Sequence, residues 1–397
     1  MNKTVACCYL TYNHPETMDE VLQNICPTYV SKGIDVYVFD SSENDDTLRI
    51  VEKYQNIYAE GLYYVNVDFI SSGDEKYLYV LKESGLNEKY DYIWPTKDRC
   101  YFSGKTLDAI IDAIEQDSDV ILAVDERDRY EFYIPNYCDD YSDCVNFFAH
   151  YGHLTTNWEA LIRKCDTMIS PIEWARYENL YKIGVNNNFN QTLTLFARLS
   201  EISNPKIKVV HVVPGEKAYS DKSKAMWVKN ILDIWIDKWV EAIFLLPKIY
   251  DEYKQAIIKS QLGHPSLFGT VDSIIALKNM GIITKEKFDT IAPVWSMLSR
   301  LPLNVISDIL NGREDDVIRK NLQEFFESFR EKDYEKSYYL FIQNGRFIDC
   351  FTSYQYLALK VSFEILINDI RHNKYSLLFE NVDSFDKLME NYKFYMK

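Results

Sequence analysis

Two short stretches near the start of the chain carry polar and charged groups that could bind a ligand. The first is Thr-Tyr-Asn-His at residues 11–14, and the second is Lys-Asp-Arg at residues 97–99. Each follows an apolar run typical of a buried strand, at residues 4–10 and 90–94. Ligands bind beyond the carboxyl ends of the strands in open α/β sheets. If both strands lie in one parallel sheet, both stretches line one crevice, which is the candidate active site.

Strand and helix patterns alternate through the part of the chain that contains these stretches. Residues 34–39 are a second strand, which ends at Asp40, Ser41 and Ser42. Further strands are predicted at residues 61–67 and 119–124, and helices lie between the strands. This alternation predicts an α/β fold with a doubly wound, mostly parallel sheet.

Helical patterns dominate the rest of the chain. They cover residues 226–246, 252–261, 271–279, 285–298, 317–330 and 355–369, with little that predicts a strand. We therefore predict a domain boundary near residue 222, with an α/β domain over residues 1–222 and an all-helical domain over residues 223–397.

Composition limits the class of partner and the compartment. The net charge is −16, which disfavours sequence-independent nucleic-acid binding because that needs clustered Lys and Arg. The eight cysteines show no C-x-x-C pair and no zinc spacing. No apolar run reaches the ~18 residues of a membrane span. With no signal peptide after Met1, reduced thiols in the cytoplasm are expected.

Three motifs, in this order, resemble family 2 glycosyltransferases of the GT-A fold. They are Leu-Thr-Tyr-Asn-His at residues 10–14, Phe-Asp-Ser-Ser-Glu-Asn-Asp-Asp-Thr at residues 39–47 and Tyr-Ile-Trp-Pro-Thr-Lys-Asp-Arg at residues 92–99. The resemblance covers residues 1 to about 215. It implies a GT-A-type sheet and transfer of a sugar from a nucleotide-sugar donor, a UDP-sugar, to a hydroxyl of a glycan or glycoprotein, with inversion.

The same resemblance implies a donor site at the strand ends. Asp40 would accept a hydrogen bond from the base or the ribose, and Tyr12 would stack. The alternative is that Asp40 and Asn13 make only turn and capping bonds. The full set of predicted donor-binding residues is Thr11, Tyr12, Asn13, His14, Asp40, Ser41, Ser42, Lys97, Arg99, Lys217 and Lys222.

The metal motif of the family is only partly present. Where the family has Asp-x-Asp, this chain has Thr96-Lys97-Asp98, with one carboxylate. A divalent cation, Mn or Mg, prefers oxygen ligands and would take Asp98, with His211 as a further ligand. Alternatively, Lys97 and Arg99 neutralise the leaving group directly, or His211 is structural.

The general base is missing from its expected place. The family carries an acidic pair before a helix that corresponds to residues 191–201, but residues 186–190 contain no acid. The candidate catalytic carboxylates are Asp98, Glu178 and Asp125, with Asp166 and the rest of the cluster at residues 125–128 as substitutes. A charged cluster that is simply a solvated loop is the competing interpretation.

The polar stretch at residues 214–224 has two alternative roles. Its Lys217 and Lys222 could close over a diphosphate as part of a lid. Otherwise the stretch is an interdomain linker. The helical domain, in turn, would bind the acceptor or form a homo-oligomer.

Three hypotheses about function follow from these residues. The first is a glycosyltransferase of protein glycosylation or polysaccharide synthesis. The second is a non-catalytic relative that binds sugar or nucleotide and supports a partner enzyme. The third is a nucleotidyltransferase, against which stands the lack of a Gly-rich basic phosphate loop near the first strand.

Overall fold

The computed structural model describes residues 2–58, 60–70, 72–125, 138–184, 187–219, 226–264, 267–298, 301–345, 347, 353–371, 387–390 and 392. These residues form two compact units. The first extends to Ile258, and the second lies within Lys259–Lys397.

The first unit is built on one large sheet. Its strand order is β3-β2-β1-β4-β8-β6-β9-β7. The strands are β1 (Val5–Thr11), β2 (Ile34–Asp40), β3 (Leu62–Asn66), β4 (Tyr92–Lys97), β6 (Val120–Val124), β7 (Asp140–Tyr141), β8 (Leu161–Lys164) and β9 (Ile207–His211). Only β7 and β8 pair antiparallel with their neighbours among these described strands. The predicted mostly parallel α/β sheet is therefore confirmed.

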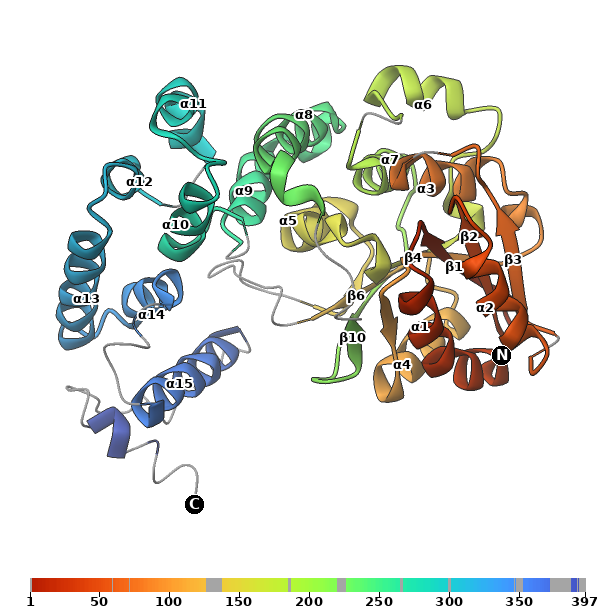
Figure 1. Ribbon diagram of the computed structural model, residues 1–397, viewed down its shortest axis with the longest axis horizontal. Coiled ribbons are helices and arrows are strands. Elements are labelled where there is room, and N and C mark those ends of the chain that lie inside the picture. Colours follow the sequence, from red (N-terminus) through yellow and green to blue (C-terminus); the bar gives the residue numbers. More distant parts are fainter. Residues whose placement is uncertain are drawn as a thin grey trace. The chain divides into compact units, whose positions relative to one another are not determined.

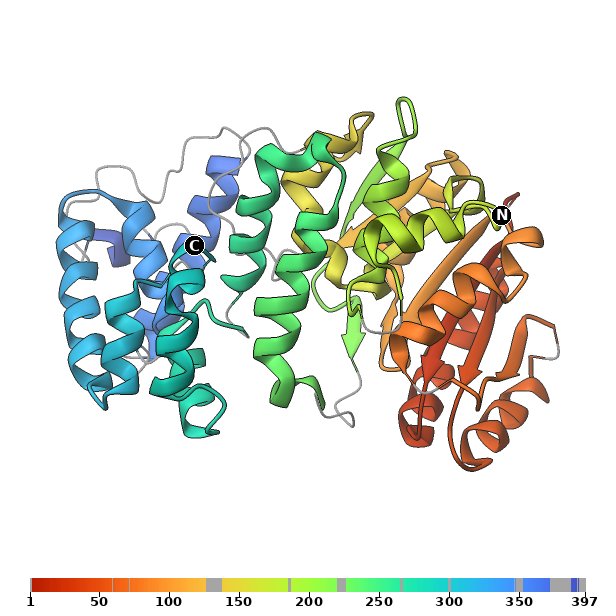
Figure 2. The same cartoon turned by 90° about the horizontal axis from the view of Figure 1, so that it is seen from above.

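Helices cover both faces of this sheet (Figures 1 and 2). One face carries α1 (Pro15–Tyr29) and α4 (Gly104–Glu115), and the other carries α3 (Gly73–Lys82) and α7 (Asn190–Leu199). Tyr29 of α1 stacks on Trp94 of β4 with ring centroids 5.8 Å apart. On the opposite face, buried Arg163 of β8 donates to Thr194 of α7 over 2.9 Å. Apolar strands covered on both faces agree with the nearly continuous burial of β1 and β6.

Shorter elements complete this unit. They are α2 (Asp46–Gln55), α5 (Cys144–Tyr151), α6 (Trp174–Tyr181), η1 (Val30–Lys32), η2 (Leu86–Glu88), η4 (Gly152–Thr156), η5 (Trp158–Ala160), η6 (Cys165–Thr167), η7 (Met226–Asn230), the π-helix η8 (Asp233–Lys238), α8 (Trp239–Leu245), η9 (Lys248–Tyr250) and the start of α9 (Asp251–Leu262).

A second, two-stranded sheet lies next to the end of β4. Strand β5 (Cys100–Phe102) pairs antiparallel with β10 (Lys217–Tyr219). The residue before β10, Glu216, accepts hydrogen bonds from the backbone N–H of Thr106 over 2.7 Å and from its hydroxyl over 2.8 Å. Glu216 thus caps α4 from a distant part of the chain. Gly104 has φ +54, which favours glycine, and a Cβ there would lie 2.4 Å from the Glu216 carboxylate and displace it.

Aromatic packing joins α8 and η9 to the first unit. Trp239 is fully buried and contacts Phe189 with ring centroids 4.9 Å apart. The Tyr250 hydroxyl donates to the carbonyl of Phe196 over 3.0 Å. The compact units therefore divide later in the sequence than residue 222, because the first helices beyond that position pack on α7.

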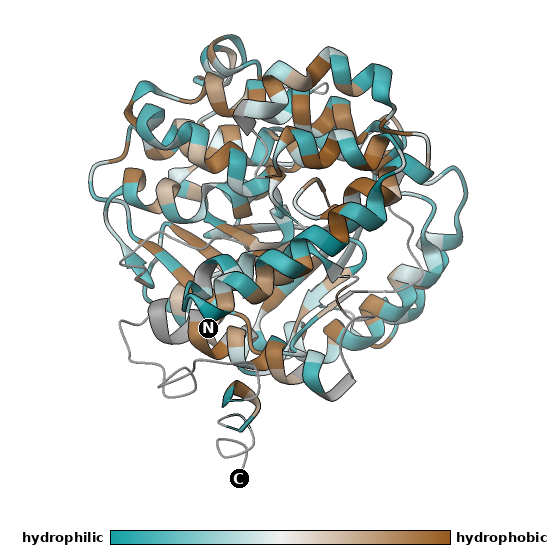
Figure 3. Ribbon diagram, turned by 90° about the vertical axis from the view of Figure 1, so that its left-hand side faces the viewer, coloured by the Kyte–Doolittle hydropathy of each residue, from teal (hydrophilic) through white to brown (hydrophobic). Residues whose placement is uncertain are grey.

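The second unit is helical, as predicted for this part of the chain. Its helices are the end of α9, α10 (Val271–Asn279), α11 (Lys285–Leu298), α12 (Leu303–Leu310), α13 (Glu314–Arg330), α14 (Tyr334–Gln343) and α15 (Ser353–Arg371). Phe325 of α13 is central to a buried cluster with Phe341 and Phe363. Brown and teal bands alternate along the helices in Figure 3, as expected where one helix face is buried.

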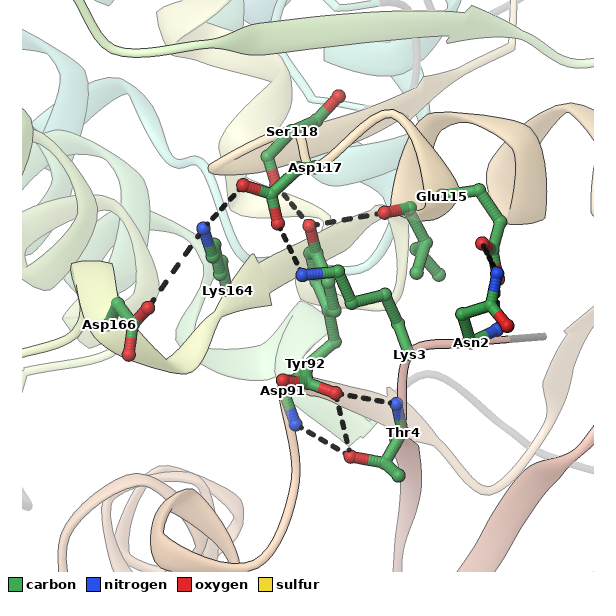
Figure 4. Close-up of polar contacts among 11 residues, drawn as sticks. Asn2, Lys3, Thr4, Asp91, Tyr92, Glu115, Asp117, Ser118, Lys164 and Asp166 are labelled. Carbon is green, nitrogen blue, oxygen red and sulfur yellow. Dashed lines mark hydrogen bonds and ion pairs between the residues drawn. The ribbon is translucent and has the colours of Figure 1, made fainter.

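Polar ties hold the amino-terminal edge of the large sheet (Figure 4). Asp91 accepts from the backbone N–H of Thr4 over 2.8 Å and from its hydroxyl over 3.0 Å. Asp117 pairs with Lys3 over 2.7 Å and with Lys164 over 2.8 Å. Lys164 first and Lys3 second lower the pKa of Asp117 to about 2. These contacts link β1 and β8 with the turn before β6.

The described helices include none long and apolar enough to cross a membrane.

The packing of α8 on α7 is testable by removing the Trp239 side chain. We expect Trp239→Ala to lower the free energy of unfolding by about 3–5 kcal/mol, because it empties a buried aromatic site. Urea denaturation followed by circular dichroism measures this change. Phe244→Ala on the same helix is the control, since Phe244 is 60% exposed, and an equal loss in both variants would contradict the packing.

Candidate active site

The carboxyl ends of three neighbouring strands form the candidate site. β1 is paired in parallel with both β2 and β4, and Thr11 stands opposite Asp40 while Leu10 stands opposite Lys97. The two stretches singled out from the sequence therefore lie side by side. We call this set the edge site: Thr11, Tyr12, Asn13, His14, Asp40, Ser41, Ser42, Lys76, Lys97, Asp98, Arg99, Glu159 and Lys217.

Asp40 is held firmly at the end of β2. It is 1% exposed. Its Oδ1 accepts from the backbone N–H and the hydroxyl of Ser42 over 2.9 and 2.5 Å. Its Oδ2 accepts from the Tyr64 hydroxyl over 3.0 Å, and burial, then Asp40, raise the pKa of Tyr64. A carboxylate can accept about four hydrogen bonds, so Asp40 retains capacity for a ligand.

The turn after β1 is fixed on the turn after β2. Asn13 has φ +53, a left-handed conformation that Asn tolerates. Its backbone N–H donates to the Ser42 hydroxyl over 2.8 Å, and its side chain accepts from the backbone of Glu43 over 3.2 Å. Tyr12 is 46% exposed and donates to Glu43 over 3.0 Å. Asp40 and Asn13 thus make the turn bonds that a purely structural role would require. These bonds are compatible with ligand binding at the same residues.

Asp98 is buried and already accepts two hydrogen bonds on one oxygen. Its Oδ2 lies 3.0 Å from the Thr11 hydroxyl and 2.8 Å from Nδ1 of His14. The hydrogen bond to Asp98 raises the pKa of His14 above 6.5, while burial and the charge of Arg99 oppose the shift. Asp98 therefore links the two strand ends.

Lys76, in the first turn of α3, was not predicted from the sequence. It is 4% exposed, and its Nζ donates to the carbonyl of Thr11 over 2.5 Å and to the Ser41 hydroxyl over 3.0 Å. Burial lowers the pKa of Lys76 to about 8, against the pull of Asp98 and Asp40. The sequence held one indication of a special role for Lys76, because a lysine near the start of a helix opposes the helix dipole.

Glu159 is the second residue that sequence reasoning missed. It lies in η5, directly before β8, the strand that pairs with β4. The Glu159 carboxylate is 2.9 Å from Nζ of Lys97 and 3.9 Å from Nζ of Lys217. Burial alone would raise its pKa, but the two lysines bring the pKa of Glu159 to about 2.

Lys217 lies in β10, so this part of the predicted lid or linker is a strand. Its side chain is 1% exposed. Lys222 lies outside the described residues. The described part of the 214–224 stretch is therefore fixed against the core.

Asp98 and His211 do not meet as a metal pair. Strands β8 and β6 lie between β4 and β9, so the strand ends are separated by three steps of about 4.8 Å, roughly 14 Å in total. His211 instead bonds Asp139 over 2.7 Å. No group of three or more His, Cys, Asp or Glu side chains in the described ranges could hold a metal ion.

The edge site does not fit a divalent cation well. The Asp98 carboxylate is hydrogen-bonded to His14, and the neighbouring residue Lys97 forms an ion pair with Glu159. A divalent cation of this kind prefers several oxygen ligands. The predicted Mn or Mg site thus has one carboxylate, and that carboxylate is already engaged.

The remaining predicted carboxylates divide between the two edges of the sheet. Asp125 is buried and directly follows β6, at the carboxyl edge. Glu178 pairs over 2.8 Å with Lys82, at the far end of α3 from Lys76. Asp166 follows the antiparallel strand β8 and lies with Lys164 at the amino edge (Figure 4). Of these three, only Asp125 is on the side of the edge site; the rest of the predicted cluster, residues 126–128, lies outside the described residues.

Comparisons with known proteins give distant structural neighbours only. No family model and no curated protein matches this sequence. Residues 1–349 of TarS from S. aureus are 17% identical, over 86% of this chain and 91% of that chain, with a TM-score of 0.44. Mannosyltransferase PcManGT from Pyrobaculum calidifontis, in complex with GDP-Man and Mn2+, is 13% identical, over 82% of this chain and 88% of that chain, with a TM-score of 0.43.

A third neighbour is glucosyl-3-phosphoglycerate synthase from Mycobacterium tuberculosis, in complex with Mn2+, UDP and glucosyl-3-phosphoglycerate. It is 11% identical, over 62% of this chain and 82% of that chain, with a TM-score of 0.40. These neighbours are GT-A-type glycosyltransferases. At such identities and TM-scores, the function of this chain has to be inferred from its own residues.

The burial of Lys76 predicts a pH dependence of stability. Its pKa is about 8 in the folded chain and 10.5 ordinarily. Between these values the unfolded chain binds more protons than the folded chain, so the free energy of unfolding rises with pH. From about pH 7 to about pH 9.5, we expect wild type to gain about 2 kcal/mol relative to Lys76→Met.

Urea denaturation at both pH values measures this difference. Lys53→Met is the control, because Lys53 is exposed and its pKa is raised by Asp19 rather than lowered. Parallel pH profiles for wild type and Lys76→Met would contradict the burial of a titrating Lys76.

Proposed function

We propose that this chain is a glycosyltransferase that moves a sugar from a UDP-sugar to a hydroxyl of a glycan or glycoprotein, with inversion at the transferred carbon. The observation that carries the proposal is the convergence of Thr11, Asp40 and Lys97 at registered, adjacent strand ends. Hydrogen-bond acceptors that would bind a nucleoside lie there beside cations that would bind a diphosphate.

The nucleoside would bind at the ends of β1 and β2. Asp40 keeps acceptor capacity for the uracil N–H or a ribose hydroxyl, because its protein donors occupy part of its lone pairs. The exposed ring of Tyr12 provides a surface for the base. The bonds of Asn13 and Ser42 keep this region in one shape before the ligand arrives.

The diphosphate would lie toward the end of β4. When the sugar leaves, negative charge grows on the diphosphate oxygens, and fixed cations stabilise that charge. Lys97 and Arg99 are the nearest candidates, since both are half-buried at this edge. Stabilising the leaving group in this way lowers the barrier to transfer.

The acceptor hydroxyl needs a general base, and Asp125 is the candidate. It follows β6 on the edge that carries the other site residues, and it is 7% exposed. Glu178 and Asp166 are tied to lysines elsewhere. A carboxylate that takes the acceptor proton would allow direct attack on the sugar. The helical part of the chain would bind the acceptor or join two copies.

A non-catalytic relative is the second candidate. It is favoured by Asp98, the single carboxylate of the Thr96-Lys97-Asp98 motif, whose Oδ2 already accepts from Thr11 and His14. Such a protein would bind the nucleotide through the same edge site without turning it over.

Turnover separates these two candidates. We expect release of UDP from at least one member of a panel of UDP-sugars with glycan acceptors, measured by a coupled UDP assay. Asp125→Asn should lower the rate about 100-fold or more while UDP affinity stays within a few-fold, because a base acts on the acceptor. UDP binding without release across the panel would favour the non-catalytic relative, and release of pyrophosphate would point to a nucleotidyltransferase.

The nucleoside contact predicts the effect of changing Asp40. We expect Asp40→Asn to weaken UDP binding about tenfold or more, because a hydrogen bond to a charged acceptor is worth about 1.5–3 kcal/mol. Isothermal calorimetry measures the affinity. Asp46→Asn, an exposed carboxylate at the start of α2, is the matched control. Unchanged affinity in a folded Asp40→Asn protein would remove Asp40 from the site.

A further inference from the structure

Lys97 of the edge site is partly exposed, whereas its counterion Glu159 is buried. Glu159 is 1% exposed and Lys217 is 1% exposed, whereas Lys97 is 26% exposed. A ligand that approaches the end of β4 therefore meets the ammonium group of Lys97 rather than the carboxylate behind it. One of the three donors of that ammonium faces Glu159 at 2.9 Å, which leaves donors for an anion.

Lys97 is also held in place more firmly than a surface lysine. Its partner Glu159 is itself held on β4, because the carbonyl of Glu159 accepts from the indole N–H of Trp94 over 2.9 Å. Lys217, fixed by the pairing of β10 with β5, shares the same carboxylate. A preorganised cation of this kind stabilises a bound anion without a large loss of side-chain entropy.

A divalent cation would meet poor conditions at the same place. Asp98 uses one oxygen for both Thr11 and His14, and the hydrogen bond from His14 favours the charged imidazole. Lys76 lies close enough that Asp98 and Asp40 act on its pKa. These positive charges repel a cation brought close to Asp98, and the repulsion is twice as strong for a divalent ion as for a monovalent one.

We infer that this chain binds the diphosphate of its nucleotide without a divalent cation, with Lys97 as the contacting cation and Glu159 and Lys217 as the residues that position it. The inference rests on the proposed function, because it assumes a nucleoside diphosphate at the edge site. It replaces the Mn or Mg ion expected from the sequence with protein cations.

The test is calorimetric titration of UDP into the full chain, once in EDTA and once in Mn2+. We expect dissociation constants that agree within about threefold, because the metal adds no essential contact. Lys97→Gln should weaken UDP binding in EDTA about tenfold or more. Lys97→Arg should retain most of the affinity, because a guanidinium also binds phosphate. Lys53→Gln, an exposed lysine of α2 paired with Asp19, is the control for a general loss of charge.

The positioning role has its own readout. If Glu159 acts through Lys97, the loss caused by Lys97→Gln shrinks when Glu159 is already Gln, since coupled residues are not additive. Thermal melts confirm that each variant is folded. Independent, additive effects would assign Glu159 a merely structural role and overturn that part of the inference.

Two outcomes distinguish this inference from the proposed function. UDP binding that requires Mn2+, and that Asp98→Asn abolishes even in Mn2+, would overturn the metal-free site and leave a nucleotide-dependent function standing. No binding of UDP or GDP in either condition would overturn both.

Discussion

A carboxylate buried at the edge of a sheet has to be neutralised, and at Glu159 this requirement organises the surrounding chain. Its partners come from different segments: Lys97 from the end of β4, and Lys217 from β10. Lys217 reaches Glu159 because β10 pairs with β5, which directly follows the turn after β4. Removing one partner would leave the buried charge with a single counterion, which destabilises the folded chain. The segment after β9 is therefore fixed by electrostatics as much as by backbone pairing.

The two edges of the large sheet differ in how the polar residues at the strand ends are bonded. At the amino edge, Asp91 and Asp117 accept from neighbouring residues that lie near them in space, and these contacts tie strands and turns together. At the carboxyl edge, Asp40 and Asp98 are buried, and the residues around them include Lys97, which is partly exposed. The contacts at the amino edge hold the fold together, whereas the carboxyl edge has the groups that could bind an anion. This contrast within one sheet is what directs the functional proposal to the carboxyl edge.

The local patterns of the sequence identified most of the first unit and part of the site. Apolar runs predicted β1, β2 and β4, and the polar residues that follow them, Thr11 and Asp40 among them, lie together because parallel strands share an edge. Lys76 and Glu159 were missed because their importance comes from partners distant in sequence, which no local period records. The pairing of β10 with β5 was missed because each strand has three residues, too few for a periodic signal. His211 is the last residue of β9, and the strand order places it away from Asp98.

The long-range cap of α4 has a consequence for the order in which the chain can mature. The first turn of α4 depends on Glu216, which lies 110 residues after Thr106. A ribosome adds about 5–20 residues per second, so α4 leaves synthesis about 5–20 s before its capping residue exists. During that interval the backbone N–H of Thr106 has no Glu216 carboxylate to bind and must be satisfied by solvent. The α/β unit can therefore be completed only after residues 216–217 have been synthesised, and the same segment brings Lys217 to Glu159.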